Sequence, residues 1–266
     1  MVMRTKMMIM YFLLLAMPAA LPGQSDGNGR GADAVIVHSA AEQLFALANQ
    51  ARVQAGVPPL EWDPALATAA LRHCQRMAAE GPIAHRYGGE MSVSERASAA
   101  GAHFSLIEEN VALGDYPAQI QDGWLHSPEH RANMLNPEVN RVGIGVVKSH
   151  GALYAVADFD KNVDVLSNSQ VERRVEQLMR VSGITIRSRK GDARAACAMN
   201  NRLPSRLSGG TPVLVMRWQG PDMNRLPKQL TKQLASGRFR SAEVGACPAQ
   251  TSQSTFTTYR VAVLLY

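Results

Sequence analysis

The segment VGIGVVKSHGALYAVADF, residues 142–159, constrains the fold of this chain more than any other stretch. Its β-branched and aromatic residues are interrupted only at Ser149–Gly151, a pattern typical of two β-strands joined by a turn. We therefore expect strands at 142–148 and 152–159. The residues before this hairpin should then supply the layers that cover a sheet.

Helical periodicity dominates the residues that precede the hairpin. Apolar residues recur at helical spacing up to Gly56, and Asp63 then caps a second helix that carries Pro64 in its first turn. Three further helix starts are marked by a capping box or by proline in the first turn: 92–95, Pro117 and Ser127–Pro128.

The segment FSLIEENVALG, residues 104–114, is expected to be partly extended and then to turn. Helices followed by a hairpin predict a layered α/β (α+β) domain.

The first residues have the layout of a secretory signal. Two basic residues precede an apolar run from about Met7 to Leu21, and small residues and a proline follow. A run of roughly 15 residues is short for a bilayer crossing, which needs about 20. We predict a signal peptide at 1–23, a flexible leader at 24–38, and a secreted, periplasmic or cell-envelope location. Membrane attachment is expected only through an uncleaved signal segment.

Charge divides the chain into two parts. Residues 1–162 hold 12 Lys and Arg against 16 Asp and Glu, a net charge of −4, whereas residues 163–266 hold 16 against 6, a net charge of +10. This change predicts a boundary near 161–168, between a first domain at 39–161 and a basic module at 168–266.

The basic module alternates helical and extended patterns, so we expect a smaller mixed α/β fold. Its expected elements are helices at 169–183 and 223–237, a strand at 211–218, and a terminal strand at 255–266 that is apolar enough to be central. Because export places the chain in an oxidising compartment, Cys197 and Cys247 are predicted to form a disulfide. Cys74, inside a helical pattern, is expected to be a buried thiol.

Five residues from separate segments are candidates for a chemical site: His85, Glu108, Glu109, Glu129 and His130. Histidines with a carboxylate can bind Zn²⁺ or another divalent metal. Alternatively, a His–Glu pair can hold a water or hydroxyl group and move its proton near neutral pH. Spacing does not decide between these two kinds of site. The other histidines are expected to be surface or packing residues: His38, His73, His103, His126 and His150.

Five segments, in this order and spacing, resemble the CAP superfamily in its short bacterial form. They are the helical region ending at Gly81, His85, EENVALG at 108–114, WLHSPEHRANML at 124–135, and the hairpin. The superfamily comprises the cysteine-rich secretory, antigen-five and pathogenesis-related proteins, whose shared unit is also called the SCP domain. The resemblance covers about residues 41–160 and implies a three-layer α-β-α sandwich with a groove across one face.

The resemblance also implies which residues line the groove. His85 and His130 match the family's two histidines, and Glu109 matches the glutamate of its GEN motif. Ser127 stands where the family has its second glutamate, so that carboxylate is missing. Glu129 could replace it only if its side chain turned inward, because neighbours on a helix point about 100° apart. The remaining motif positions are expected to be structural: Asn110, Trp124, Arg131 and Asn133.

Three functions remain open from the sequence. In the first, the groove of an exported domain binds a small apolar ligand, a peptide or a cell-envelope component through His85, Glu109 and His130, with a divalent metal on the two histidines. In the second, the same residues form a metal-assisted hydrolase that acts on a peptide or ester. In the third, the protein is structural and docks on the envelope through its basic module. A basic surface that is merely solvated is the plainer alternative, and export argues against nucleic acid as a partner.

Overall fold

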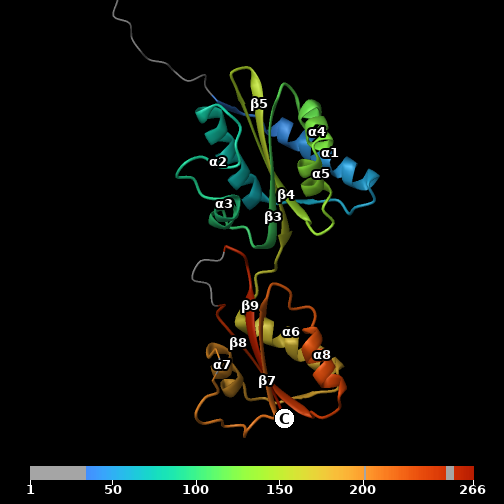
Figure 1. The fold of residues 1–266 in the computed structure, drawn as a ribbon, viewed down its shortest axis with the longest axis vertical. Helices are drawn as coiled ribbons and strands as arrows, with labels where there is room; N and C mark the ends of the chain where they lie inside the picture. Colours follow the sequence, from blue (N-terminus) through green and yellow to red (C-terminus); the bar gives the residue numbers. More distant parts are fainter. Residues whose placement is uncertain (1–33, 201, 250–254) are drawn as a thin grey trace, which may run out of the picture. The chain divides into compact units, whose positions relative to one another are not determined.

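The computed structural model describes residues 34–200, 202–249 and 255–266, and within these ranges the chain forms two sheets with helices packed against each (Figure 1). The signal peptide predicted at 1–23 lies outside the described residues, as does most of the predicted leader. No helix in the described ranges is long and apolar enough to cross a bilayer.

The first sheet is built around the predicted hairpin. β4 (Arg141–Ser149) and β5 (Ala152–Asn162) pair antiparallel, and β3 (Phe104–Gly114) pairs with the other side of β5. Two short strands, β1 (Val35–Ile36) and β2 (Glu61–Trp62), both pair with the outer edge of β4. The resulting strand order is β1-β4-β5-β3.

Helices cover both faces of this sheet (Figure 1). α2 (Pro64–Glu80) and α3 (Val93–Ala99) lie on one face, and α1 (His38–Gln54), α4 (Pro117–His126) and α5 (Pro128–Leu135) lie on the other. Buried residues of α1, α4 and α5 form one apolar cluster with the sheet, and those of α2 form another. The predicted three-layer α-β-α architecture is confirmed.

Two glycines of β4 determine how closely α2 can approach the sheet. A Cβ atom added at Gly143 would lie 1.9 Å from the backbone nitrogen of Ala67, and one at Gly145 would lie 2.4 Å from the Cα of Leu71. Because side chains alternate along a strand, Ile144 between them points to the opposite face, into the α1 cluster. The VGIGVV pattern therefore seats a helix backbone directly on the strand.

The second sheet has the strand order β6-β8-β9-β7. Its strands are β6 (Thr185–Ile186), β7 (Leu214–Gly220), β8 (Ser241–Cys247) and β9 (Tyr259–Leu265). The terminal strand was expected to be central, and β9 does lie between β8 and β7. The mixed α/β fold predicted for this part of the chain is confirmed.

Helices α6 (Asn168–Val181), α7 (Gly191–Ala198) and α8 (Lys228–Ala235) accompany this second sheet. α8 starts later than the predicted helix at 223–237 because Pro227 precedes it in the N-cap position with non-helical backbone angles. A disulfide joins Cys197 of α7 to Cys247 at the end of β8. The domain limits 39–161 and 168–266 stay predictions.

Three local expectations need correction. Residues 104–114 do not turn, because β3 pairs with β5 along its length as far as Gly114. Residues 35–38 are not flexible leader, since β1 pairs with β4 and α1 begins at His38. Ser127 occupies the N-cap position of α5, but its side chain makes no capping hydrogen bond. Cys74 is fully buried as a free thiol, as expected.

Candidate functional site

Three separate elements bring His85, Glu109 and His130 together. His85 lies in the loop after α2, Glu109 on β3, and His130 in the first turn of α5. The Nδ1 atom of His85 is 2.9 Å from Oε1 of Glu109, and the ring centroids of His85 and His130 are 6.4 Å apart. The His85 side chain is 59% exposed to solvent, and His130 is half-buried.

Glu109 is held by a buried arginine. Arg96, on α3, donates a hydrogen bond to Oε2 of Glu109, and the side chains are only 5% and 4% exposed. Arg96 also donates to the carbonyl oxygens of His85, at 3.3 Å, and Met91, at 3.0 Å. The capping box that starts α3 therefore positions one arginine that orients both the carboxylate and the histidine loop.

A buried histidine, His73, holds the loop that carries His85. His73 is fully buried on α2; its Nδ1 lies 2.7 Å from Oε1 of Glu90, and its Nε2 lies 2.8 Å from the carbonyl oxygen of Ala84. Both partners lie in the segment that carries His85. The sequence placed His73 among surface or packing residues, and its packing role here is to anchor the site.

Asparagines fix His130 to the sheet. The Nδ2 of Asn110 donates to the carbonyl oxygen of His130 at 2.9 Å, and the Nδ2 of Asn133 donates to the carbonyl oxygen of Glu109 at 3.2 Å. Trp124 is buried and donates from Nε1 to a β3 carbonyl. Arg131 is exposed and forms no ion pair with any described residue, so its expected carboxylate partner is not found there.

The surroundings of His85 and His130 shift the pKa values of the two rings in opposite directions. The hydrogen bond to Glu109 raises the pKa of His85 above its ordinary value, although burial opposes this. Burial lowers the pKa of His130, and the positive charge of His85 lowers it further. The negative charge of Glu129 favours the protonated form of both rings. It adds to the upward shift of the His85 pKa and partly opposes the downward shift of the His130 pKa. At a pH between the two pKa values, His85 is protonated while His130 is neutral.

Comparison with protein families identifies this architecture. Residues 45–159 match the family model named CAP, the cysteine-rich secretory protein family. The chain contains a CAP domain.

Two relatives come from Bacillus subtilis (strain 168). The uncharacterized membrane protein YlbC is 32% identical over 114 residues, which are 41% of this chain and 32% of that protein. The uncharacterized protein YkwD is 28% identical over 109 residues, 41% of this chain and 42% of that protein. The match to this chain thus spans about a third and two fifths of these relatives' lengths.

Two solved structures each match about half of this chain. An extracellular protein containing a SCP domain from Bacillus anthracis is 26% identical, covers 47% of this chain and 41% of its own, and has a TM-score of 0.44. An outer surface protein from Borrelia burgdorferi is 20% identical, covers 49% of this chain and 98% of its own, and has a TM-score of 0.46.

The CAP domain has a second carboxyl group at the site, which was not among the residues predicted from the sequence. Asp158 of β5 lies directly opposite Glu109 in the register of β3 and β5, is fully buried, and has no hydrogen-bond partner for either oxygen among the described residues. Burial raises its pKa well above the usual range, and the charge of Glu109 adds to this. An acidic residue inside the apolar strand YAVADF was the available signal, and no carboxylate replaces Ser127 on α5 itself.

The other two predicted carboxylates do not join the His85–Glu109 pair. Glu108 points to the opposite face of β3, where the Nδ2 of Asn136 donates to its Oε1 at 3.0 Å and burial raises its pKa. Glu129 is exposed on α5 and acts on the histidines only through its charge.

A metal would find two nitrogen ligands in this CAP domain. Nδ1 of His85 is engaged by Glu109, which leaves Nε2 of His85 and one nitrogen of His130. Among the described residues, no group of three or more His, Cys, Asp and Glu side chains is arranged to hold an ion. Catalytic zinc sites use three protein ligands, so these residues do not complete one. Metal binding by His85 and His130 stays a prediction.

Proposed function

We propose that this protein is an exported CAP-domain module whose groove holds a peptide or cell-envelope ligand between His85 and His130. The observation that carries the proposal is that His85, held by Glu109 at 2.9 Å, and His130 come from separate elements to place their ring centroids 6.4 Å apart. The pKa of His85 is raised and that of His130 is lowered, which fits two different roles in binding. A protonated His85 donates a hydrogen bond from Nε2, and a neutral His130 accepts one. A hydroxyl group, which both accepts and donates a hydrogen bond, is complementary to this pair.

Export and envelope location rest on two further features. The first 23 residues have the layout of a signal peptide, and the Cys197–Cys247 disulfide is of the kind that persists in oxidising compartments. The net charge of +10 on residues 163–266 complements anionic envelope polymers.

Cosedimentation of the full chain with insoluble peptidoglycan tests the proposal. High salt screens the contribution of the basic residues, so the remaining binding reports on the groove. His85→Ala and His130→Ala should each lose most of this binding. His126→Ala is the matched control, because its side chain is 78% exposed on α4 and pairs with Asp122. Binding that persists in the folded His85→Ala/His130→Ala double variant would contradict the proposal.

The same opposed pKa values favour one second candidate, a hydrolase of peptide or ester bonds. Groups whose pKa values are pushed apart are suited to act as base and acid, here His130 and His85. No hydroxyl or thiol side chain among the described residues hydrogen-bonds either ring, so water would be the nucleophile. A bell-shaped pH dependence of p-nitrophenyl acetate hydrolysis that shifts in Glu109→Gln would support this candidate. Turnover no faster than in His85→Ala would exclude it for that ester.

A further inference from the structure

The outer edge of β4 is paired at both ends and open in the middle. β1 pairs with Val147 and Lys148, and β2 pairs with Arg141 and Val142. Between these pairs the chain leaves the edge twice, after Val37 to begin α1 and after Asp63 to begin α2. Residues 143–146 therefore have a strand neighbour, β5, on one side only.

The alternation of the backbone shows which polar groups face this gap. The carbonyl oxygen of Val142 accepts from the Asp63 N–H at 2.9 Å, and that of Val146 accepts from the Val37 N–H at 3.0 Å, both on the outer edge. In an antiparallel strand the direction repeats every two residues, so Ile144 also directs its N–H and carbonyl outward. Neither short strand reaches Ile144, and no other described residue hydrogen-bonds to it.

Ile144 as a whole residue is only 3% exposed, and no described residue pairs with its outward N–H and carbonyl. More than nine in ten buried backbone groups in proteins have a hydrogen-bond partner, since leaving one unpaired costs free energy. An occupant that supplied a donor and an acceptor at this edge would remove that cost.

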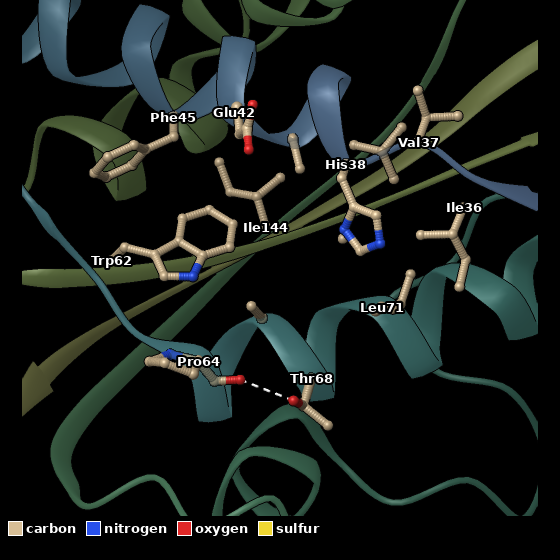
Figure 2. Close-up of a pocket in the computed structure, with 14 residues that line it drawn as sticks. Ile36, Val37, His38, Glu42, Phe45, Trp62, Pro64, Thr68, Leu71 and Ile144 are labelled. Carbon is tan, nitrogen blue, oxygen red and sulfur yellow. Dashed lines mark hydrogen bonds between the residues drawn. The ribbon is translucent and has the colours of Figure 1, made fainter.

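A cavity of about 530 Å³ opens at this edge between the first turns of α1 and α2. Figure 2 shows the indole of Trp62 and the imidazole of His38 pointing into it from its two ends, with Ile144 between them. Phe45 stacks edge-on against Trp62, with ring centroids 5.5 Å apart, and Leu71 closes the α2 side. The volume lies in the range of small-ligand sites, and none of its lining residues belongs to the His85–His130 groove.

We propose that this cavity binds a short extended peptide with apolar side chains, which adds to β4 as a strand between β1 and β2. Its backbone would pair with the N–H and carbonyl of Ile144, and its side chains would alternate between the α1 and α2 walls. The gap from Val142 to Val146 spans about 13 Å of strand, the length of roughly three to four residues. An acyl chain would fill the apolar walls equally well but would leave both backbone groups of Ile144 unpaired.

Binding of acetyl-Val-Leu-Val-amide to the full chain tests this site. The amide resonance of Ile144 should shift saturably, and the emission of Trp62 should change with the same midpoint. An analogue methylated on every backbone nitrogen keeps the apolar side chains but cannot donate, and it should bind at least tenfold more weakly. Equal binding of the two peptides, no shift at Ile144, or binding of dodecanoate without binding of the tripeptide would each overturn the proposal.

Variants locate the site independently of spectroscopy. Ala67→Trp places an indole in the cavity and should abolish peptide binding, whereas Val53→Trp adds the same group to an exposed position of α1 outside the cavity and should not. If Ala67→Trp does not fold, Trp62→Ala removes one wall from an exposed position and should weaken binding at least fivefold. Unchanged affinity in a folded cavity variant would contradict the proposal, and binding that survives His85→Ala keeps this site distinct from the groove.

Discussion

Glu109 links two of the site's side chains, His85 and Arg96. Oε1 accepts from His85 and Oε2 accepts from Arg96, and the carboxyl group of Asp158 lies beside it on the next strand. One buried residue therefore controls the orientation of the histidine and the balance of charge around it.

Replacing Glu109 with Gln should lower the pKa of His85. The hydrogen bond to the carboxylate is the largest cause of the raised pKa, and an amide oxygen carries no charge to favour the imidazolium. NMR titration of the ring protons measures the change. An unchanged His85 titration would show that Glu109 does not set its protonation.

The buried carboxyl group of Asp160 should make the free energy of unfolding depend on pH. This fully buried carboxyl on β5 has no hydrogen-bond partner for either oxygen among the described residues, and burial, with the charge of Asp63, raises its pKa to about 7. A pKa raised in the folded state means that the unfolded state loses its proton first. The stability contribution is therefore present below about pH 4 and is lost as pH rises towards 7.

Asp160→Asn should remove this dependence. At pH 8 the variant should be more stable than the parent by about 3 kcal/mol, because it buries no ionised carboxylate, and near pH 4 the difference should be small. Chemical denaturation at both pH values measures it. Asp164→Asn, which alters an exposed ion pair with Arg174, should show no comparable gain at pH 8. A variant that is less stable at pH 8 would contradict the assigned protonation.

At the residue scale, the resemblance to a family predicted more of the site residues than composition and spacing did. His85, Glu109 and His130 were named from motifs, and the structure places them within reach of one another. Asp158 was not predicted as a site residue, because its position beside Glu109 depends on the register between β3 and β5, which a single sequence does not display. The contact of Arg96 with Glu109 depends on how α3 packs against β3, which a single sequence does not display either.

At the element scale, segments with a clear period or a marked helix start were predictable, whereas the two-residue strands were not. α1, α2, β4 and β5 have enough residues for a period to emerge. Strands β1, β2 and β6 each have two residues, and their extended conformation comes from their partners rather than from their own pattern. α7 has only eight residues, half of them alanine, with glycine or a charged residue at three positions. Its sequence therefore shows no clear apolar face at helical spacing.

The contact between α2 and β4 gives the clearest test of packing. Gly143→Ala should destabilise the CAP domain by about 3 kcal/mol or more, because the new Cβ would overlap the backbone of α2, which cannot move as a side chain can. Gly123→Ala is the matched control: it lies in α4 with nothing within 4 Å of an added Cβ, and it should stabilise by roughly 0.5–1 kcal/mol. Thermal unfolding compares them, and similar transitions for both variants would refute the close approach.

At the scale of the whole molecule, each sheet has its own buried cores. Residues of α1, α2, α4 and the strands β3–β5 form one set of apolar clusters, and residues of α6, α7, α8 and β6–β9 form another. The change in net charge near residue 162 coincides with this change of core. Separate cores predict that a perturbation in one set leaves the other folded.

The disulfide makes that expectation measurable. It closes a loop with a sequence separation of 50, so its loss in Cys197→Ala/Cys247→Ala should destabilise the second sheet by about 4 kcal/mol, mainly through greater freedom of the unfolded chain. Hydrogen exchange followed by mass spectrometry should show faster exchange in β8 and β9 and unchanged exchange in β4 and β5. A reducing agent should reproduce this pattern in the parent protein and have no further effect on the variant. If β4 and β5 exchange faster to the same extent, the two sheets unfold together, and the charge boundary near residue 162 does not separate independent folding units.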